Sequence, residues 1–115
     1  MRAFTTVLAM LLMTAAASAT DIRKGATMRV KADTLWFEDA GKFARWQRMK
    51  TRDAAATIAR QEQSMLRARE AWRFEGVQSV KVLDLGVKGG GVRVEMLAEG
   101  RMQGTRWVVE EGAVE

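Results

Sequence analysis

The sequence predicts a mainly β fold with an α insertion: a small five-stranded antiparallel barrel that carries an inserted helical hairpin. Three observations support this prediction. Apolar and polar residues alternate over much of the stretch from residue 77 to 109, which is typical of strands with one buried face. Glycine-rich turns separate these alternating runs. Between residues 39 and 70 the apolar spacing changes to three and four, which is typical of amphipathic helices.

The first 19 residues have the features of a secretory signal peptide. Arg2 supplies a positive charge, residues 7–13 form a short apolar run, and residues 17–19 match the small-residue cleavage rule. The apolar run is shorter than the roughly 20 residues that a membrane anchor needs. We therefore expect cleavage of residues 1–19, a single mature domain over residues 20–115 with no membrane span, and a periplasmic or secreted location.

The first strand is predicted over residues 28–37, where apolar and charged side chains alternate at the start. Asp39 follows this strand and is a suitable N-cap for a first helix, because a short carboxylate can accept a hydrogen bond from a backbone N–H of the first turn. Either Thr51 or Asp53 is expected to cap the second helix for the same reason.

The inserted hairpin is predicted over residues 39–70. In its first helix Phe43, Trp46 and Met49 are three apart and therefore share one face. The stripe of the second helix, interrupted only by Gln61, consists of Ala54, Ile58, Met65, Ala68 and Trp72. Because neither helix is long or apolar enough to persist alone, we expect Phe43, Trp46, Ile58 and Met65 to pack against the barrel.

The remaining strands are predicted as a meander near the C-terminus. A turn over residues 88–91 connects two alternating strands, and a second turn over residues 100–104 leads to a strand at residues 105–110. Residues 113–114 form the expected last short strand. Together with the first strand this makes about five, which is enough to close a small barrel.

Cysteine and histidine are absent from all 115 residues. Their absence removes thiolate metal sites, a cysteine nucleophile, the commonest metal ligand and the usual general base near neutral pH. Carboxylates such as Asp33, Glu38 and Asp84 remain, but no spacing singles out a pair for hydrolysis. We therefore predict no catalytic residues, no cofactor and no metal, and keep a small carboxylate hydrolase as the last alternative.

The basic residues concentrate in the predicted insertion. Residues 42–73 hold nine basic and three acidic side chains, a net of +6, whereas the whole mature chain has a net of +4. This charge predicts a binding surface for an anionic protein or wall polymer. The site residues that we expect on it are Arg45, Arg48, Arg52 and Arg60. Interleaved aromatic residues also fit nucleic acid, but the predicted export disfavours that partner. A groove near Trp36 is the alternative binding surface.

The end of the sequence consists of a Val-x-Val strand pair, a glycine turn, the run from Gly104 to Val109 and a short terminal strand. This pattern resembles the end of bacterial Src-homology-three-like domains, in which a glycine precedes a tryptophan near the last long strand, as Gly104 precedes Trp107. The resemblance covers about the last third of the chain and implies an exported five-stranded barrel. The insertion departs from the family's short variable loop beside the ligand groove, so we carry over no peptide or peptidoglycan specificity. An oligonucleotide-binding-type barrel is the competing five-stranded fold.

These observations predict an exported, non-catalytic binding or accessory module of the cell envelope. The main alternative is a self-associating structural subunit of an envelope assembly.

Overall fold

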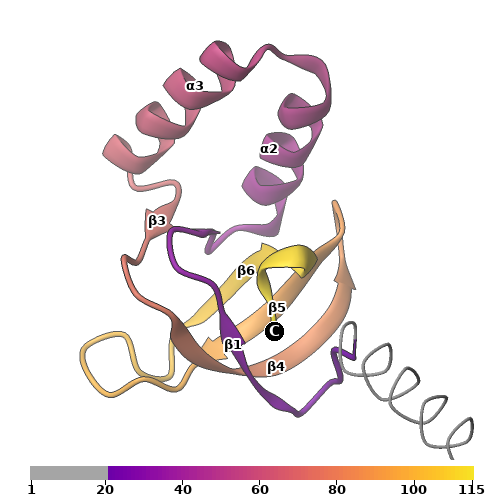
Figure 1. The fold of residues 1–115 in the computed structure, drawn as a ribbon, viewed down its shortest axis with the longest axis vertical. Helices are drawn as coiled ribbons and strands as arrows, with labels where there is room; N and C mark the ends of the chain where they lie inside the picture. Colours follow the sequence, from indigo (N-terminus) through magenta and orange to yellow (C-terminus); the bar gives the residue numbers. More distant parts are fainter. Residues whose placement is uncertain (1–20) are drawn as a thin grey trace, which may run out of the picture.

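A computed structural model of the chain describes residues 21–115, so the predicted signal peptide lies outside the described residues (Figure 1). Its main sheet is antiparallel, with the strand order β1-β4-β5-β6. These strands are β1 (Thr27–Val30), β4 (Gln78–Val87), β5 (Gly91–Met96) and β6 (Arg106–Glu110). A second, two-stranded sheet pairs β2 (Leu35–Trp36) with β3 (Trp72–Arg73). The elements between β2 and β3 are the helices α2 (Ala40–Arg52) and α3 (Ala55–Arg67).

The meander predicted near the C-terminus is present. In the β4–β5 hairpin Val80 lies opposite Met96 and Val82 opposite Val94, and all four side chains are buried. The connecting turn contains Gly89 and Gly90 at φ 87° and 84°, the left-handed region that glycine enters without steric cost. The alternation in the sequence therefore identified the inward face of these strands correctly.

The predicted first strand is divided into two. β1 ends at Val30, and β2 begins only at Leu35, in a different sheet. In the turn between them Asp33 has φ 61°, and the Thr34 hydroxyl donates a hydrogen bond to the Lys31 carbonyl at 2.8 Å. The prediction of one continuous strand was wrong because the apolar residues on the two sides of this turn serve two separate pairings.

No closed barrel is found over residues 21–115, because β1 and β6 remain the edges of the four-stranded sheet. The predicted last strand is instead a short 3-10 turn, η1 (Glu111–Ala113), followed by one isolated bridge from Val114 to Val30 of β1. At the other edge, Phe37 and Val108 exchange two backbone hydrogen bonds of 3.0 and 2.6 Å. Both edges are thus partly covered, but by segments too short to form a continuous fifth strand.

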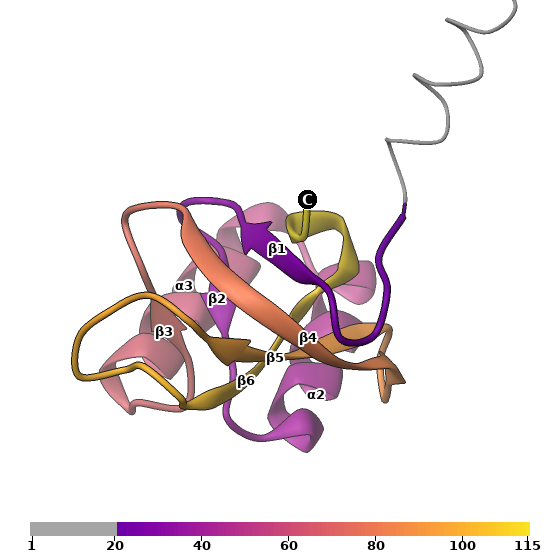
Figure 2. The same ribbon diagram turned by 90° about the horizontal axis from the view of Figure 1, so that it is seen from below.

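The two helices lie on one side of the sheet, behind it when the molecule is viewed from below (Figure 2). The Asp39 cap is confirmed, since its Oδ1 accepts a hydrogen bond from the Gly41 N–H at 2.8 Å. The predicted cap of the second helix was wrong. Ala54 occupies that position without a side-chain hydrogen bond, while the Thr51 hydroxyl donates to the Arg48 carbonyl inside α2.

The apolar stripe predicted for the second helix is only partly buried. Phe43 and Trp46 of α2 and Met65 of α3 are buried, as expected. Ile58 is only half-buried and belongs to neither core cluster, so its predicted packing against the sheet is corrected. α3 stands farther from the four-stranded sheet than α2 does (Figure 1), and Met65 is its one buried residue.

An aromatic cluster fills the core between the two sheets. Trp107 contacts Trp36, Trp72 and Phe74 edge-on, with ring centroids 6.0, 6.1 and 5.9 Å away. The indole N–H of Trp107 donates to the Thr105 hydroxyl at 2.7 Å, whereas those of Trp36 and Trp72 are buried without an acceptor among the described residues. The two fully enclosed indoles, Trp36 and Trp107, therefore differ in hydrogen bonding.

This difference gives a matched prediction. Trp36→Phe and Trp107→Phe remove the same indole atoms from sites that are 0% and 2% exposed. Only the second substitution also loses a hydrogen bond, so we expect it to lower the free energy of unfolding by about 0.5–1.5 kcal/mol more than the first. Urea titration of both variants measures this difference. A larger loss for Trp36→Phe would mean that the indole of Trp36 has an acceptor.

Candidate functional site

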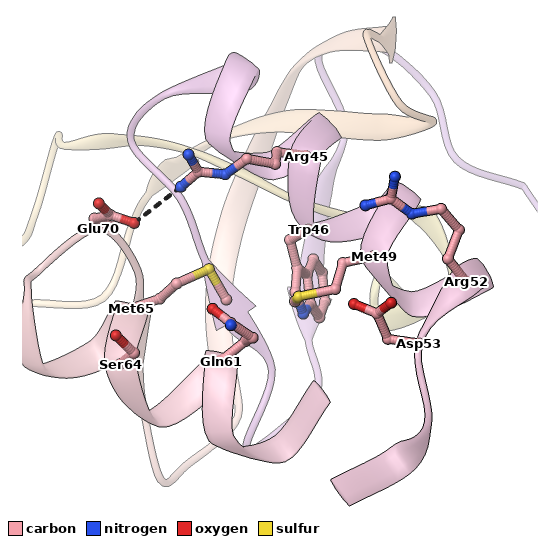
Figure 3. Close-up of a pocket in the computed structure, with 9 residues that line it drawn as sticks. All are labelled: Arg45, Trp46, Met49, Arg52, Asp53, Gln61, Ser64, Met65 and Glu70. Atoms are coloured by element: carbon pink, nitrogen blue, oxygen red, sulfur yellow. Dashed lines mark hydrogen bonds and ion pairs between the residues drawn. The ribbon is translucent and has the colours of Figure 1, made fainter. Parts of the chain in front are cut away.

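A cleft of about 470 Å³ separates α2 from α3 (Figure 3). Its floor is apolar and is formed by Trp46, Met49 and Met65, which are 4%, 9% and 6% exposed. Its rim is polar and charged, and consists of Arg45, Arg52, Asp53, Gln61, Ser64 and Glu70. The cleft thus combines an apolar base with side chains that can form ion pairs and hydrogen bonds.

Trp46 is fixed by contacts on several sides. Its ring packs against Phe37 and Phe43, with centroid distances of 5.2 and 5.9 Å. Its indole N–H donates a hydrogen bond to the Glu62 carboxylate of α3 at 2.9 Å, and the Lys50 ammonium lies 3.9 Å from its ring centroid. The floor of the cleft is therefore held in place by both helices and by the edge of the sheet.

The wall formed by α3 is attached mainly through polar contacts. Glu62 accepts the Trp46 hydrogen bond and lies 3.8 Å from the Arg73 guanidinium of β3. Beyond α3, Glu70 forms an ion pair of 3.2 Å with Arg45. Because the Arg45 side chain is 60% exposed, water screens this pair and it contributes little to stability. Met65 is the one buried residue of α3, whereas α2 has four, so α3 is less firmly packed than α2.

The four predicted arginines do not form one continuous face. Arg45, Arg48 and Arg52 are three and four residues apart on α2, so they share one exposed stripe, and the first and last of them reach the cleft rim. Arg60 belongs instead to a shallow depression on α3, together with Ala59, Gln63 and Arg67. The structure thus brings three of the predicted residues together and separates the fourth.

Charge on the α2 stripe is only partly neutralised within the described chain. Arg45 is paired with Glu70, as described above. Over residues 21–115, no carboxylate oxygen lies within 4 Å of the guanidinium of Arg48 or Arg52. Both side chains are exposed and can therefore meet an external anion without first breaking an internal ion pair.

Trp36, the residue that marked the alternative groove, is 0% exposed. Its ring meets that of Phe74 edge-on at 5.0 Å, inside the aromatic cluster. A depression of about 370 Å³ does lie nearby, lined by Glu38, Met102, Thr105, Arg106 and Trp107. Trp36 does not line it, so its ring offers no surface to a ligand in this structure.

Over residues 21–115, no group of three carboxylate, histidine or cysteine side chains is placed to hold a metal ion. Among the helices of the same residues, none has the length and apolar character needed to cross a bilayer.

The cleft itself was not predicted from the sequence. Apolar residues that line its floor have the same spacing as residues packed in a core, so the spacing of Trp46 and Met49 predicts packing. Trp46 was otherwise considered only as one of the aromatic residues interleaved with the basic ones. Two rim residues, Arg45 and Arg52, were predicted as binding residues from their charge, and Gln61 interrupts the apolar stripe of α3 on the same rim. Ser64 and Glu70 gave no comparable signal.

Comparison of the chain with protein-family models, with curated proteins and with solved structures finds no match.

Proposed function

We propose that the chain is an exported, non-catalytic binding or accessory module of the cell envelope, located in the periplasm or secreted. The α2–α3 hairpin is its binding surface, and the partner is an anionic protein or wall polymer. The observation that carries this proposal is the exposed stripe of Arg45, Arg48 and Arg52 beside a cleft, with two of these cations unpaired within residues 21–115.

For the fold of this module we propose the five-stranded, Src-homology-three-like barrel, with the α2–α3 hairpin inserted between β2 and β3. Two pairings support it beyond the four-stranded sheet. Val114 bridges to Val30 immediately after the η1 turn, and Phe37 bridges to Val108. These contacts place short segments along both outer strands, as the closure of a small barrel requires.

The test of this function is a double charge reversal on α2, Arg48→Glu with Arg52→Glu. Attraction between exposed charges is screened over about 8 to 10 Å at physiological salt, so capture through this stripe falls as salt rises. We expect the reversal to slow association and to reduce capture even at low salt. Thermal stability should change little, because both side chains are exposed.

The matched control reverses two exposed cations outside the hairpin, Lys24→Glu with Arg101→Glu, and changes the net charge by the same amount. Capture of envelope proteins and of a purified anionic wall polymer is measured for the parent and both variants over a salt series. The control should behave like the parent. Equal, salt-insensitive capture by all three proteins would exclude the hairpin stripe as the binding surface.

A further inference from the structure

The two sides of the interhelical cleft carry balanced charge. Figure 3 shows the Arg45–Glu70 pair on one side of the apolar floor, with Arg52 and Asp53 on the other. A purely anionic polymer would therefore meet the carboxylates of Glu70 and Asp53 as well as the arginines along the rim. A ligand that combines apolar, polar and acidic groups uses this surface better than uniform negative charge does.

The composition of the cleft matches that of a peptide ligand. Met49 and Met65 are flexible and polarisable, so they can adapt to an inserted apolar side chain lying on Trp46. Gln61 and Ser64 are exposed on the rim and can form hydrogen bonds with the amides of an extended or helical segment. A volume of about 470 Å³ lies in the range of protein ligand pockets, about 300–1,000 Å³, towards its lower end.

Arg48 and Arg52 supply the attraction for the acidic part of such a segment. Arg52 lies on the rim, and Arg48 is one helical turn before it on the same exposed stripe. A carboxylate held next to the inserted apolar side chain would thus meet a cation that is not paired with a carboxylate within residues 21–115. Recognition of this kind is specific because both features must occur together.

From this complementarity we infer that the cleft between α2 and α3 binds an acidic peptide segment of a partner protein. The segment inserts one apolar side chain onto the floor of Trp46, Met49 and Met65 and places its carboxylates against Arg48 and Arg52. This inference rests on the proposed function of the hairpin as a binding surface, and it names the partner class and the position of the contact.

The test uses a random 12-residue peptide library displayed on phage and selected on the full chain expressed for export. Enriched peptides should carry one apolar residue flanked by Asp or Glu. Ser64→Trp fills the cleft without changing charge, and we expect it to weaken binding of an enriched peptide at least about tenfold. Gln61→Trp, a second filling change on the same rim, should cause a similar loss.

The control is Gln63→Trp, which adds the same side chain to the neighbouring position. Gln63 is exposed and lies in the separate depression with Arg60, so this variant should bind like the parent. Replacing the apolar residue of the peptide with serine should weaken binding as much as filling the cleft does. The thermal unfolding midpoint of each variant is measured first. Peptide affinities are compared only among variants whose midpoint equals that of the parent.

The inference would be overturned if the selection enriched no peptide, or only peptides without acidic residues. It would also be overturned if enriched peptides bound Ser64→Trp and Gln61→Trp as tightly as the parent. Failure here is separable from failure of the proposed function. If filling the cleft has no effect but reversal of Arg48 and Arg52 still abolishes salt-sensitive capture, the hairpin binds anions outside the cleft. The function then stands without the peptide site.

Discussion

Replacing Trp46 with alanine is expected to lower the free energy of unfolding by about 3–5 kcal/mol, as removal of a buried aromatic side chain does. The indole is 4% exposed and packs against Phe37 and Phe43. The substitution also removes the donor that Glu62 accepts at 2.9 Å. Since Met65 is the one buried residue of α3, loss of this bond should loosen α3 as well as the core.

Denaturant unfolding measures the loss, and hydrogen exchange of the α3 amides reports whether that helix opens first. The control is Ile58→Ala, because Ile58 is an apolar residue of α3 that is half-buried and outside both core clusters. Its cost should be clearly smaller. If Ile58→Ala destabilised the protein as much as Trp46→Ala, α3 would have to pack through its predicted stripe after all.

The contrast between these two residues shows what periodicity can establish. Spacing of three and four identified the apolar face of each helix and placed Phe43, Trp46 and Met65 correctly in the core. It does not show whether a second surface covers that face. Ile58 is only half-buried and joins neither core cluster, whereas Met65 of the same stripe is buried in one of them. The polar contacts of Glu62 also attach α3 to Trp46 and Arg73.

Short pairings were equally hard to predict. The glycine turn at residues 88–91 and the alternation on both sides of it are local signals, and that hairpin formed as expected. The bridges of Val114 to Val30 and of Phe37 to Val108 join single residues that are far apart in the sequence, so no period marks them. Barrel closure depends on such contacts, which explains why the strand count alone did not establish it.

The first residue of β5, Gly91, must be glycine for a reason other than the geometry of the hairpin turn. Gly91 has no positive φ, yet a Cβ at this position would lie 2.6 Å from Cγ1 of Val108 and 2.8 Å from Cε2 of Phe43. Both neighbours are fully buried side chains. Glycine is therefore needed here so that α2 can pack closely against the end of the β4–β5 hairpin.

We expect Gly91→Ala to lower the free energy of unfolding by about 1–3 kcal/mol, as overpacking of a close-packed core does. Gly112→Ala is the matched control, because a Cβ there has no atom within 4 Å, and its effect should stay within about 0.5 kcal/mol. Urea titration of both variants measures these changes. Phe43 is a buried residue of α2, so the added methyl group should also displace that helix. Binding through the hairpin should then weaken in proportion to the fraction of molecules in which α2 is displaced or the protein is unfolded. Unfolding of Gly91→Ala at the parent's urea midpoint would mean that α2 is not packed against this turn.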